Sequence, residues 1–163
     1  MKRIMYLLLI LVVVFTLSCC GNKPAEPIKP VNFYYRTVTT TYGADATIIT
    51  AEARESQGYE DNYQYLIEQY LNGPRTYDCI SPFPAGTTME EFSISSSKVQ
   101  IMLSTHMSLL SGAELMLACA CLTRTVCELT GINTVQISSD GGMLNNEESI
   151  TLTNNSFTYL DFG

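Results

Sequence analysis

The stretch SGAELMLACACLTRTVCELTG, from Ser111 to Gly131, decides the fold of this chain. Apolar residues recur in it every three or four positions, on one face of an α-helix: Leu115, Ala118, Cys119, Leu122, Val126 and Leu129. Ser111 stands at the N-cap position with Glu114 as its capping-box partner, and Gly131 stands where helices usually end. The pattern predicts a helix with both ends marked and an apolar face that a sheet must cover.

A strand follows this helix directly. Residues 134–138, TVQIS, alternate apolar with polar side chains, which is typical of a strand that is buried on one face. The triplet Asp140-Gly141-Gly142 then predicts a turn. Helix and strand together are expected to form the centre of a small domain.

A second helix is predicted upstream, over residues 59–71. Its apolar and aromatic residues fall near one face: Tyr59, Tyr63, Leu66, Ile67, Tyr70 and Leu71. Gly73 can adopt the left-handed conformation that ends a helix, and Pro74 cannot continue one. This helix is therefore expected to end at Gly73 and Pro74.

Extended segments account for most of the remaining chain. Side-chain patterns predict them at residues 31–38, 46–53, 89–95, 98–103, 149–152 and 157–162. The first two form a hairpin through residues 42–45, and the next two form an antiparallel pair. Residues 75–88 contain Pro82, Pro84 and Gly86, and this composition predicts a surface loop.

The predicted elements define an α+β fold. Their order is strand, strand, helix, strand, strand, helix, strand, followed by a β-rich tail. A small mixed sheet with two helices packed on one of its faces accounts for this order. The chain beyond the N-terminal segment, about 140 residues, has the size of one ordinary domain.

The first residues predict an export signal. Lys2 and Arg3 precede an apolar run over residues 5–17, which is shorter than the roughly 20 residues that a membrane-spanning helix needs. The run ends on two adjacent cysteines, Cys19 and Cys20, as in a bacterial lipoprotein. An ordinary secretory signal is the alternative.

Cys20 is the predicted site of lipid attachment. Leu17 occupies the aliphatic position three residues before it, and Gly21 follows it. Cys19 is the alternative site, with Ser18 before it but Thr16 at the aliphatic position.

Three segments follow from these features. Residues 1–19 are the predicted signal peptide, and residues 20–30 are a proline-rich tether without periodicity. Residues 31–163 form the domain.

The charge of the mature chain excludes some partners. Removing Lys2 and Arg3 leaves seven basic residues against sixteen acidic ones, a net charge of −9. Such a surface repels the phosphates of nucleic acids and anionic lipid headgroups. Nucleic acid is therefore not expected as a partner, and the contact with the bilayer must come from acyl chains.

Four cysteines belong to the predicted domain: Cys79, Cys119, Cys121 and Cys127. The last three lie on the predicted helix, where residues two apart point in different directions. A bridge from Cys79 to one helix cysteine is the one disulfide worth testing. The favoured interpretation is that all four are small buried apolar residues.

The sequence carries no clear catalytic or metal site. A pair of Cys121 with His106, the only histidine, or a mixed Cys/His metal site is formally possible. The spacing opposes both, because zinc cysteines usually lie in a turn, whereas Cys119 and Cys121 lie within a helix. We therefore predict no catalytic residue, no metal and no cofactor. The adjacent acidic pairs 90–91 and 147–148 predict solvated surface.

Several segments carry a family resemblance. They are residues 65–74 (YLIEQYLNGP), 81–87 (SPFPAGT), 129–132 (LTGI) and 135–141 (VQISSDG), with a tail at 152–153 and 160–162. In this order they resemble the GerMN domain of the sporulation and spore germination GerM family. The resemblance extends from about Val31 to Phe162.

The resemblance implies a non-enzymatic domain that often follows a lipoprotein signal, in the envelope of a Gram-positive, spore-forming bacterium. The implied fold is similar to the ring-building motif of secretion-type assemblies. Members with two copies are tied to the channel that links mother cell and forespore. This chain has room for a single copy.

Two functions remain open. The first, which the resemblance favours, is a membrane-anchored interaction or assembly module. It would be held to the lipid bilayer by N-terminal acyl chains such as palmitate and would bind an envelope protein or itself. The second is a module that binds or weakly hydrolyses cell-wall glycan through a tyrosine-lined groove and surface carboxylates.

Overall fold

The computed structural model describes residues 30–38, 48–56 and 58–157. The elements in these ranges are β1 (Pro30–Thr37), β2 (Ile49–Glu55), α2 (Tyr63–Leu71), β3 (Cys79–Ile80), β4 (Met89–Ile94), β5 (Val99–Leu103), the 3-10 helix η1 (Thr105–Leu109), α3 (Gly112–Thr130), β6 (Thr134–Ser139), β7 (Ser149–Thr153) and the 3-10 helix η2 (Asn154–Phe157). The predicted α+β class and the places of the two helices among the strands are confirmed.

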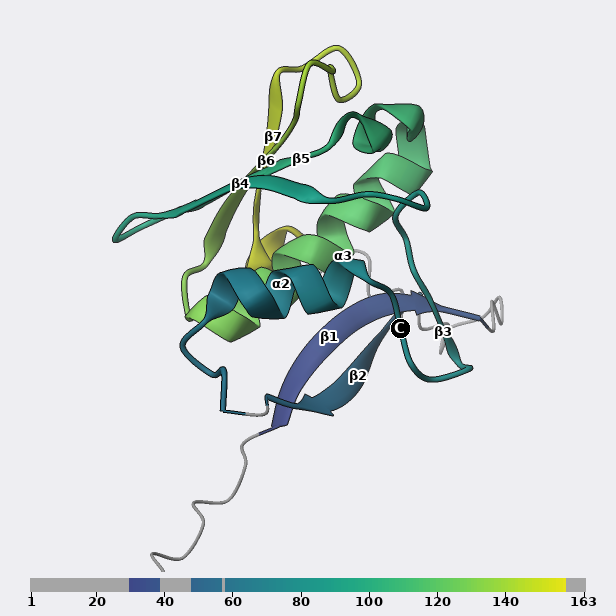
Figure 1. The fold of residues 1–163 in the computed structure, drawn as a ribbon. Helices are drawn as coiled ribbons and strands as arrows, with labels where there is room; N and C mark the ends of the chain where they lie inside the picture. The colour runs from purple at the N-terminus through teal and green to yellow at the C-terminus, as the bar shows by residue number, and fades with distance from the viewer. Residues whose placement is uncertain (1–29, 39–47, 57, 158–163) are drawn as a thin grey trace, which may run out of the picture.

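The strands form two sheets, and the prediction of a single sheet is wrong in this respect. One sheet has the order β2-β1-β3 and is antiparallel. The other has the order β4-β5-β6-β7, with β5 and β6 parallel and the remaining pairs antiparallel. Figure 1 shows α2 and α3 between the two groups of strands.

The burial of α3 explains why one sheet is not enough. Its buried residues lie around most of its circumference: Leu115, Ala118, Cys119, Ala120, Cys121, Leu122, Thr123, Thr125, Val126 and Cys127. A helix that is buried on most of its circumference needs cover on more than one side. Helix α3 is covered by β1 of one sheet and by β6 and β7 of the other.

The four-stranded sheet is built around a crossover. A parallel pair cannot be joined by a tight turn, and η1 with α3 connects β5 to β6. Val99 pairs with Val135 and Ile101 pairs with Ile137. All four side chains are buried in the core that includes the apolar residues of α3. The predicted antiparallel pairing of β4 with β5 is confirmed.

The predicted hairpin is confirmed in its antiparallel pairing, with Tyr34 opposite Ala51. Its predicted link, residues 42–45, lies outside the described residues, as do residues 46 and 47 of the expected second strand. The predicted surface loop at 75–88 contains the short strand β3, which pairs with Arg36 and Thr37. A strand of two residues is too short to produce a periodic pattern.

Helix α2 begins four residues later than predicted. Asn62 is its N-cap, and the Asn62 side chain accepts a hydrogen bond from Tyr65 N at 3.1 Å. Tyr59 therefore lies before the helix, with its ring centroid 4.3 Å from that of Tyr65. The predicted end is confirmed, because Gly73 follows the C-cap residue with φ of 94° and Pro74 comes next.

The two ends of α3 differ in how they agree with the prediction. Gly131 is the C-cap, with φ of 71°, and its N–H donates to Cys127 O at 2.9 Å, as predicted. At the other end Ser111 precedes the helix, but its side chain makes no capping hydrogen bond, and the capping box with Glu114 is wrong. Instead Gly112 N donates to Asn145 Oδ1 at 3.2 Å.

The first residue of α3 explains the missing capping box. Gly112 has φ of 55°, whereas a capping box needs a helical residue directly after the N-cap. At the C-terminal end of the chain, β7 is confirmed at residues 149–153. Of the extended tail predicted at 157–162, residue 157 ends η2 and the rest lies outside the described residues.

Candidate functional site

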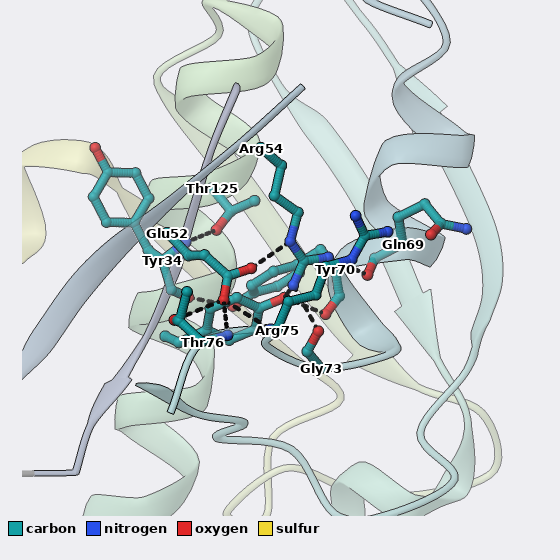
Figure 2. A network of polar contacts seen from close by, with 10 residues as sticks. Tyr34, Glu52, Arg54, Gln69, Tyr70, Gly73, Arg75, Thr76 and Thr125 are labelled. Carbon is teal, nitrogen blue, oxygen red and sulfur yellow. Dashed lines mark hydrogen bonds and ion pairs between the residues drawn. The ribbon is translucent and has the colours of Figure 1, made fainter. Parts of the chain in front are cut away.

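Two oppositely charged residues are buried on the inner face of β2. Glu52 and Arg54 lie two positions apart on the strand, so both point to the same side. Glu52 is 4% exposed and Arg54 is 8% exposed. Arg54 Nε donates to Glu52 Oε1, as Figure 2 shows. Because an uncompensated buried charge is costly, the other partners of each group decide whether this pair stabilises the fold.

Arg54 uses its remaining nitrogens on the chain at the end of α2. Nη1 donates to Gln69 O at 3.2 Å, and Nη2 donates to Gly73 O at 2.7 Å. Nη2 also lies 3.2 Å from the Tyr35 hydroxyl, and the guanidinium lies 4.9 Å from the centroid of the Phe33 ring. The last carbonyls of a helix lack partners within it and attract positive charge. Arg54 therefore serves as a side-chain cap for α2.

Glu52 holds the segment that follows α2. Its Oε2 accepts hydrogen bonds from Arg75 N, Thr76 N and Thr76 Oγ1, each at 2.8 Å. Burial alone would raise the pKa of Glu52, but these hydrogen bonds and the one from Arg54 outweigh it and hold the pKa below its ordinary value. The Glu52–Arg54 pair thus joins β2 to both the end of α2 and the next turn.

The edge of β1 that faces away from β2 is closed by side chains of both helices. Tyr34 N donates to Thr125 Oγ1 at 2.9 Å, and Tyr34 O accepts from the Tyr70 hydroxyl at 2.8 Å (Figure 2). An open strand edge would leave these backbone groups available for pairing with another strand. Thr125 of α3 and Tyr70 of α2 take the place of that strand.

The side chains at the start of β1 also contact α3. The Tyr34 hydroxyl and Asn32 Nδ2 both donate to the Glu128 carboxylate, and the Arg124 guanidinium lies 4.8 Å from the Tyr34 ring centroid. Burial, followed by the hydrogen bond and charge of Glu128, raises the pKa of Tyr34 to about 12 against the opposing charge of Arg124. At this end of β1 every polar side chain that faces α3 has a partner.

The thiols and the histidine do not form a reactive pair. The four thiols of the domain are free and buried, as the favoured interpretation predicted: Cys79, Cys119, Cys121 and Cys127. Burial raises the pKa of Cys119 and of Cys121 to about 12, and for Cys121 the charges of Arg124 and Arg36 oppose it only in part. His106 is exposed on η1, with Nδ1 3.2 Å from Ser104 Oγ.

Residues 30–38, 48–56 and 58–157 contain neither a candidate metal site nor a membrane-spanning helix. No three His, Cys, Asp or Glu side chains in these ranges gather in a way that could hold a metal ion. None of the helices there has the length and apolar character needed to cross a membrane.

A row of hydrogen-bonded polar side chains crosses the outer face of the four-stranded sheet. Gln100 Nε2 and Lys98 Nζ donate to Gln136 Oε1, at 3.0 and 2.6 Å, and Gln136 Nε2 donates to Ser149 Oγ at 2.8 Å. We call Lys98, Gln100, Gln136 and Ser149 the glutamine row. These bonds fix the orientation of the Gln136 amide between three strands.

A groove of about 490 Å³ lies beside the glutamine row. Its polar lining comes from α2 and from strands β4, β5 and β6: Gln64, Glu90, Glu91, Ser93, Gln100, Gln136 and Ser138. The groove presents amide, hydroxyl and carboxylate groups. It therefore suits a ligand or partner surface that donates and accepts hydrogen bonds.

The predicted site residues have separate places in the structure. Gly73 and Pro74 end α2, and Gly73 O also joins the Glu52–Arg54 network. Gly131 ends α3, whereas Ser111 and Glu114 do not cap it. The predicted lipidation site Cys20 and its alternative Cys19 lie outside the described residues.

Sequence reasoning missed the Glu52–Arg54 pair. A signal was present, because two opposite charges two positions apart on a predicted strand must share one face. The strand pattern alone could not tell that this face is buried. Phe33 and Tyr35, which line the same face, come from another strand and reach it only through the register of the hairpin.

A family of known proteins matches most of the domain. The sequence profile of the Germane family, described as sporulation and spore germination, matches residues 32–145. None of the curated proteins that were compared matches the chain by sequence.

Solved structures of low sequence identity share the fold. The tandem GerMN domains of the sporulation protein GerM from Bacillus subtilis align with a TM-score of 0.55 and 14% identity, over 84% of this chain and 49% of that one. This chain thus spans about half the length of the tandem structure. The first GerMN domain alone aligns with a TM-score of 0.55 and 16% identity, over 71% of this chain and 86% of that one.

A third solved structure has a similar length to this chain. It is that of a candidate lipoprotein from Clostridium perfringens, with a TM-score of 0.50 and 19% identity, over 82% of this chain and 94% of that one. At these identities the three structures establish the fold.

Proposed function

Because the chain belongs to the Germane family of sporulation and spore germination, we propose that it is a non-enzymatic interaction module of the cell envelope. An acyl chain on Cys20, or on Cys19, holds it to the outer face of the cell membrane. Its partner is an envelope protein or a second copy of the chain, in sporulation or spore germination. The similarity to the C. perfringens candidate lipoprotein and to B. subtilis GerM supports the anchor and the process, respectively.

The observation that carries the proposal is the groove beside the glutamine row. Its amides are held by hydrogen bonds within the sheet, so they lose little rotational freedom when a partner binds. Uncharged polar groups dominate it, as in the moderately polar surfaces of non-obligate interfaces. The groove lies on exposed strands, where a large partner can reach it.

The placement of reactive groups supports a role without catalysis. The thiols are buried and protonated at neutral pH, because burial raises their pKa. The Glu52 carboxylate is occupied by four hydrogen bonds and is shielded from solvent. A nucleophile or general base must be accessible to a substrate.

Affinity capture from sporulating cells tests the partner surface. Ser93→Arg places a bulky charge in the groove, and Ala53→Arg places the same charge on the exposed face of β2, away from it. We expect Ser93→Arg to reduce recovery of the crosslinked partner at least about tenfold, as burying an unpaired charge at an interface does. Equal recovery of the partner by both variants would show that the groove is not the interface.

The anchor is tested by labelling cells with an alkynyl palmitate analogue. Wild-type chain is expected to incorporate the label and to fractionate with membranes. Cys20→Ser is expected to abolish both, whereas Cys19→Ser keeps them. Loss of label only in Cys19→Ser would assign the lipid to Cys19, and label in neither the wild type nor the variants would remove the anchor from the proposal.

Binding of cell-wall glycan is the second candidate function. The carboxylates and amides of the groove, such as Glu91 and Gln100, are groups that hydrogen-bond sugar hydroxyls. Retention of the chain by purified peptidoglycan, lost in Gln100→Leu but not in Gln69→Leu outside the groove, would favour it. Release of sugar fragments that stops in Glu91→Gln would indicate weak hydrolysis.

A further inference from the structure

A second hollow lies at the other end of β1 from the contacts of Tyr34. It has a volume of about 240 Å³ and is bounded by β1, by the loop after β3 and by the first turns of α3. Arg36, Glu114 and Ser81 supply its polar groups, and its apolar wall consists of Pro82, Phe83, Pro84, Leu110 and Leu117. We call it the Arg36–Glu114 pocket.

Arg36 is held firmly at this pocket by its backbone. It lies in the middle of the three-stranded sheet, opposite Ile49 of β2 on one side and Ile80 of β3 on the other. It is two positions from Tyr34, so both side chains point to the side of β1 that contacts α3. The positive charge of Arg36 also acts on α3, where it lowers the pKa of Cys121 against the larger effect of burial.

Among the described residues, the charges of the pocket have no partner. Arg36 and Glu114 carry opposite charges and line the same pocket, yet no ion pair or hydrogen bond joins either side chain to a described residue. The polar side chains at the other end of β1 differ, since Asn32 and Tyr34 both donate hydrogen bonds to Glu128. A ligand with two charges of opposite sign would satisfy both groups.

The apolar wall of the pocket favours a ligand that carries an apolar group beside its two charges. Phe83 is buried, and Leu110 and Leu117 are half-buried, so an apolar group that entered the pocket would remove further apolar surface from water. The volume lies below the roughly 300–1,000 Å³ of sites for drug-sized ligands. A small molecule or a single residue fits, whereas a polymer does not.

We propose that the Arg36–Glu114 pocket binds a free amino acid with an apolar side chain. Arg36 binds its carboxylate, Glu114 binds its ammonium group, and Leu110 and Leu117 contact its side chain. A guanidinium recognises a carboxylate through two parallel hydrogen bonds, which makes it the most specific part of such a site. The pocket is separate from the groove beside the glutamine row, so the inference does not depend on the proposed function.

The test is an NMR titration of the full ¹⁵N-labelled chain in mild detergent with L-leucine. We expect saturable shifts at the amides of Ser81, Phe83, Leu110 and Leu117, with a Kd on the order of 1 mM for so small a ligand. No shift at these amides up to about 20 mM leucine, well above that Kd, would overturn the proposal.

Two analogues separate the charged contacts. 4-Methylpentanoate lacks the ammonium group of leucine, and isopentylamine lacks its carboxylate. N-acetyl-leucine represents the carboxyl end of a peptide rather than a free amino acid. Each is expected to bind about tenfold more weakly than leucine, because one charged group of the pocket stays unpaired. Equal binding of N-acetyl-leucine would assign the pocket to peptide ends and would overturn the role of Glu114.

Two variants with matched controls complete the test. Arg36→Gln and Glu114→Gln are each expected to weaken leucine binding about tenfold, whereas Arg75→Gln and Glu55→Gln, at exposed positions outside the pocket, leave it unchanged. Glu114 is exposed, so its replacement keeps the fold even if Arg36→Gln does not. Equal affinity in Glu114→Gln and Glu55→Gln would overturn the proposal.

Discussion

The two arginines of the β1–β2 hairpin, Arg54 and Arg36, differ in the partners that the fold gives them. Arg54 is buried and bonded to a carboxylate, to two backbone carbonyls and to a hydroxyl. Arg36 is half-buried and lines a pocket without an ion pair or hydrogen bond to a described residue. A buried charge with all its partners fixes the fold, whereas a charge left without them is available for a ligand.

The largest expected effect comes from breaking the network of the buried arginine. Arg54→Met leaves the Glu52 charge uncompensated and should lower the free energy of unfolding by about 3–5 kcal/mol. Arg36→Met should change it by less than about 1 kcal/mol, because Arg36 has no ion pair or hydrogen bond to lose among the described residues. Urea unfolding followed by circular dichroism measures both, and equal losses would remove the distinction between the two arginines.

The double variant Glu52→Leu with Arg54→Met sharpens this result. It removes both charges and fills the space with apolar groups, so it should be more stable than Arg54→Met alone. A double variant as unstable as the single one would show that Glu52 is not the source of the loss.

Acid is expected to lower the free energy of unfolding by less than Arg54→Met does, because protonated Glu52 can still accept some hydrogen bonds. The pKa of Glu52 is lower in the folded chain than its ordinary value. Its contribution is therefore fully present above the unfolded pKa of about 4.3 and is lost as the pH falls through the lower folded pKa. The urea concentration at the midpoint of unfolding, measured from pH 7 downward, should decrease as the pH drops below about 4.3. Glu52→Gln should make this decrease smaller.

Two buried threonines of α3 offer a smaller version of the comparison. Thr125 Oγ1 accepts a hydrogen bond from Tyr34 N, whereas Thr123 Oγ1 is buried without a partner in the described part of the chain. Thr125→Val should cost about 1–3 kcal/mol of stability because a buried N–H loses its acceptor. Thr123→Val should be neutral or stabilising, and thermal unfolding of the two variants decides the point.

The smallest expected effect concerns the start of α3. Asn145→Ala removes the acceptor of Gly112 N and should cost about 1 kcal/mol, as loss of a helix cap does. Ser111→Ala should stay within about 0.5 kcal/mol, because the Ser111 side chain makes no capping bond. The opposite order in chemical denaturation would restore the capping box that the sequence predicts.

The parts of the fold that sequence could predict are those set by neighbouring residues. Periodicity placed α3 within one residue of its observed bounds, and Gly131 and Gly73 were correct as helix ends. The start of α2 was missed because Tyr59 fits the helical period although Asn62 interrupts it as a cap. Strand β3 was missed because two residues show no pattern.

Of the candidate sites, the sequence offered only fragments. Glu52 and Arg54 share a face by their spacing, but their remaining partners come from β1, from the end of α2 and from the turn after it. Arg36 and Glu114 are far apart in the chain, and nothing in their local sequence links them. The sequence could indicate the family of the protein but neither of the two candidate binding surfaces.

The sequence by itself determined the two long helices, their C-terminal ends and the longer strands, because those choices depend on side chains and backbone angles within a few positions. Only the tertiary structure decided that the strands divide into two sheets, that Asn145 caps α3, and that Arg54 has an ion pair with another described residue while Arg36 has none. The physical reason is that a buried charge or amide must find its partner wherever packing brings one, and packing joins residues that are distant in the chain.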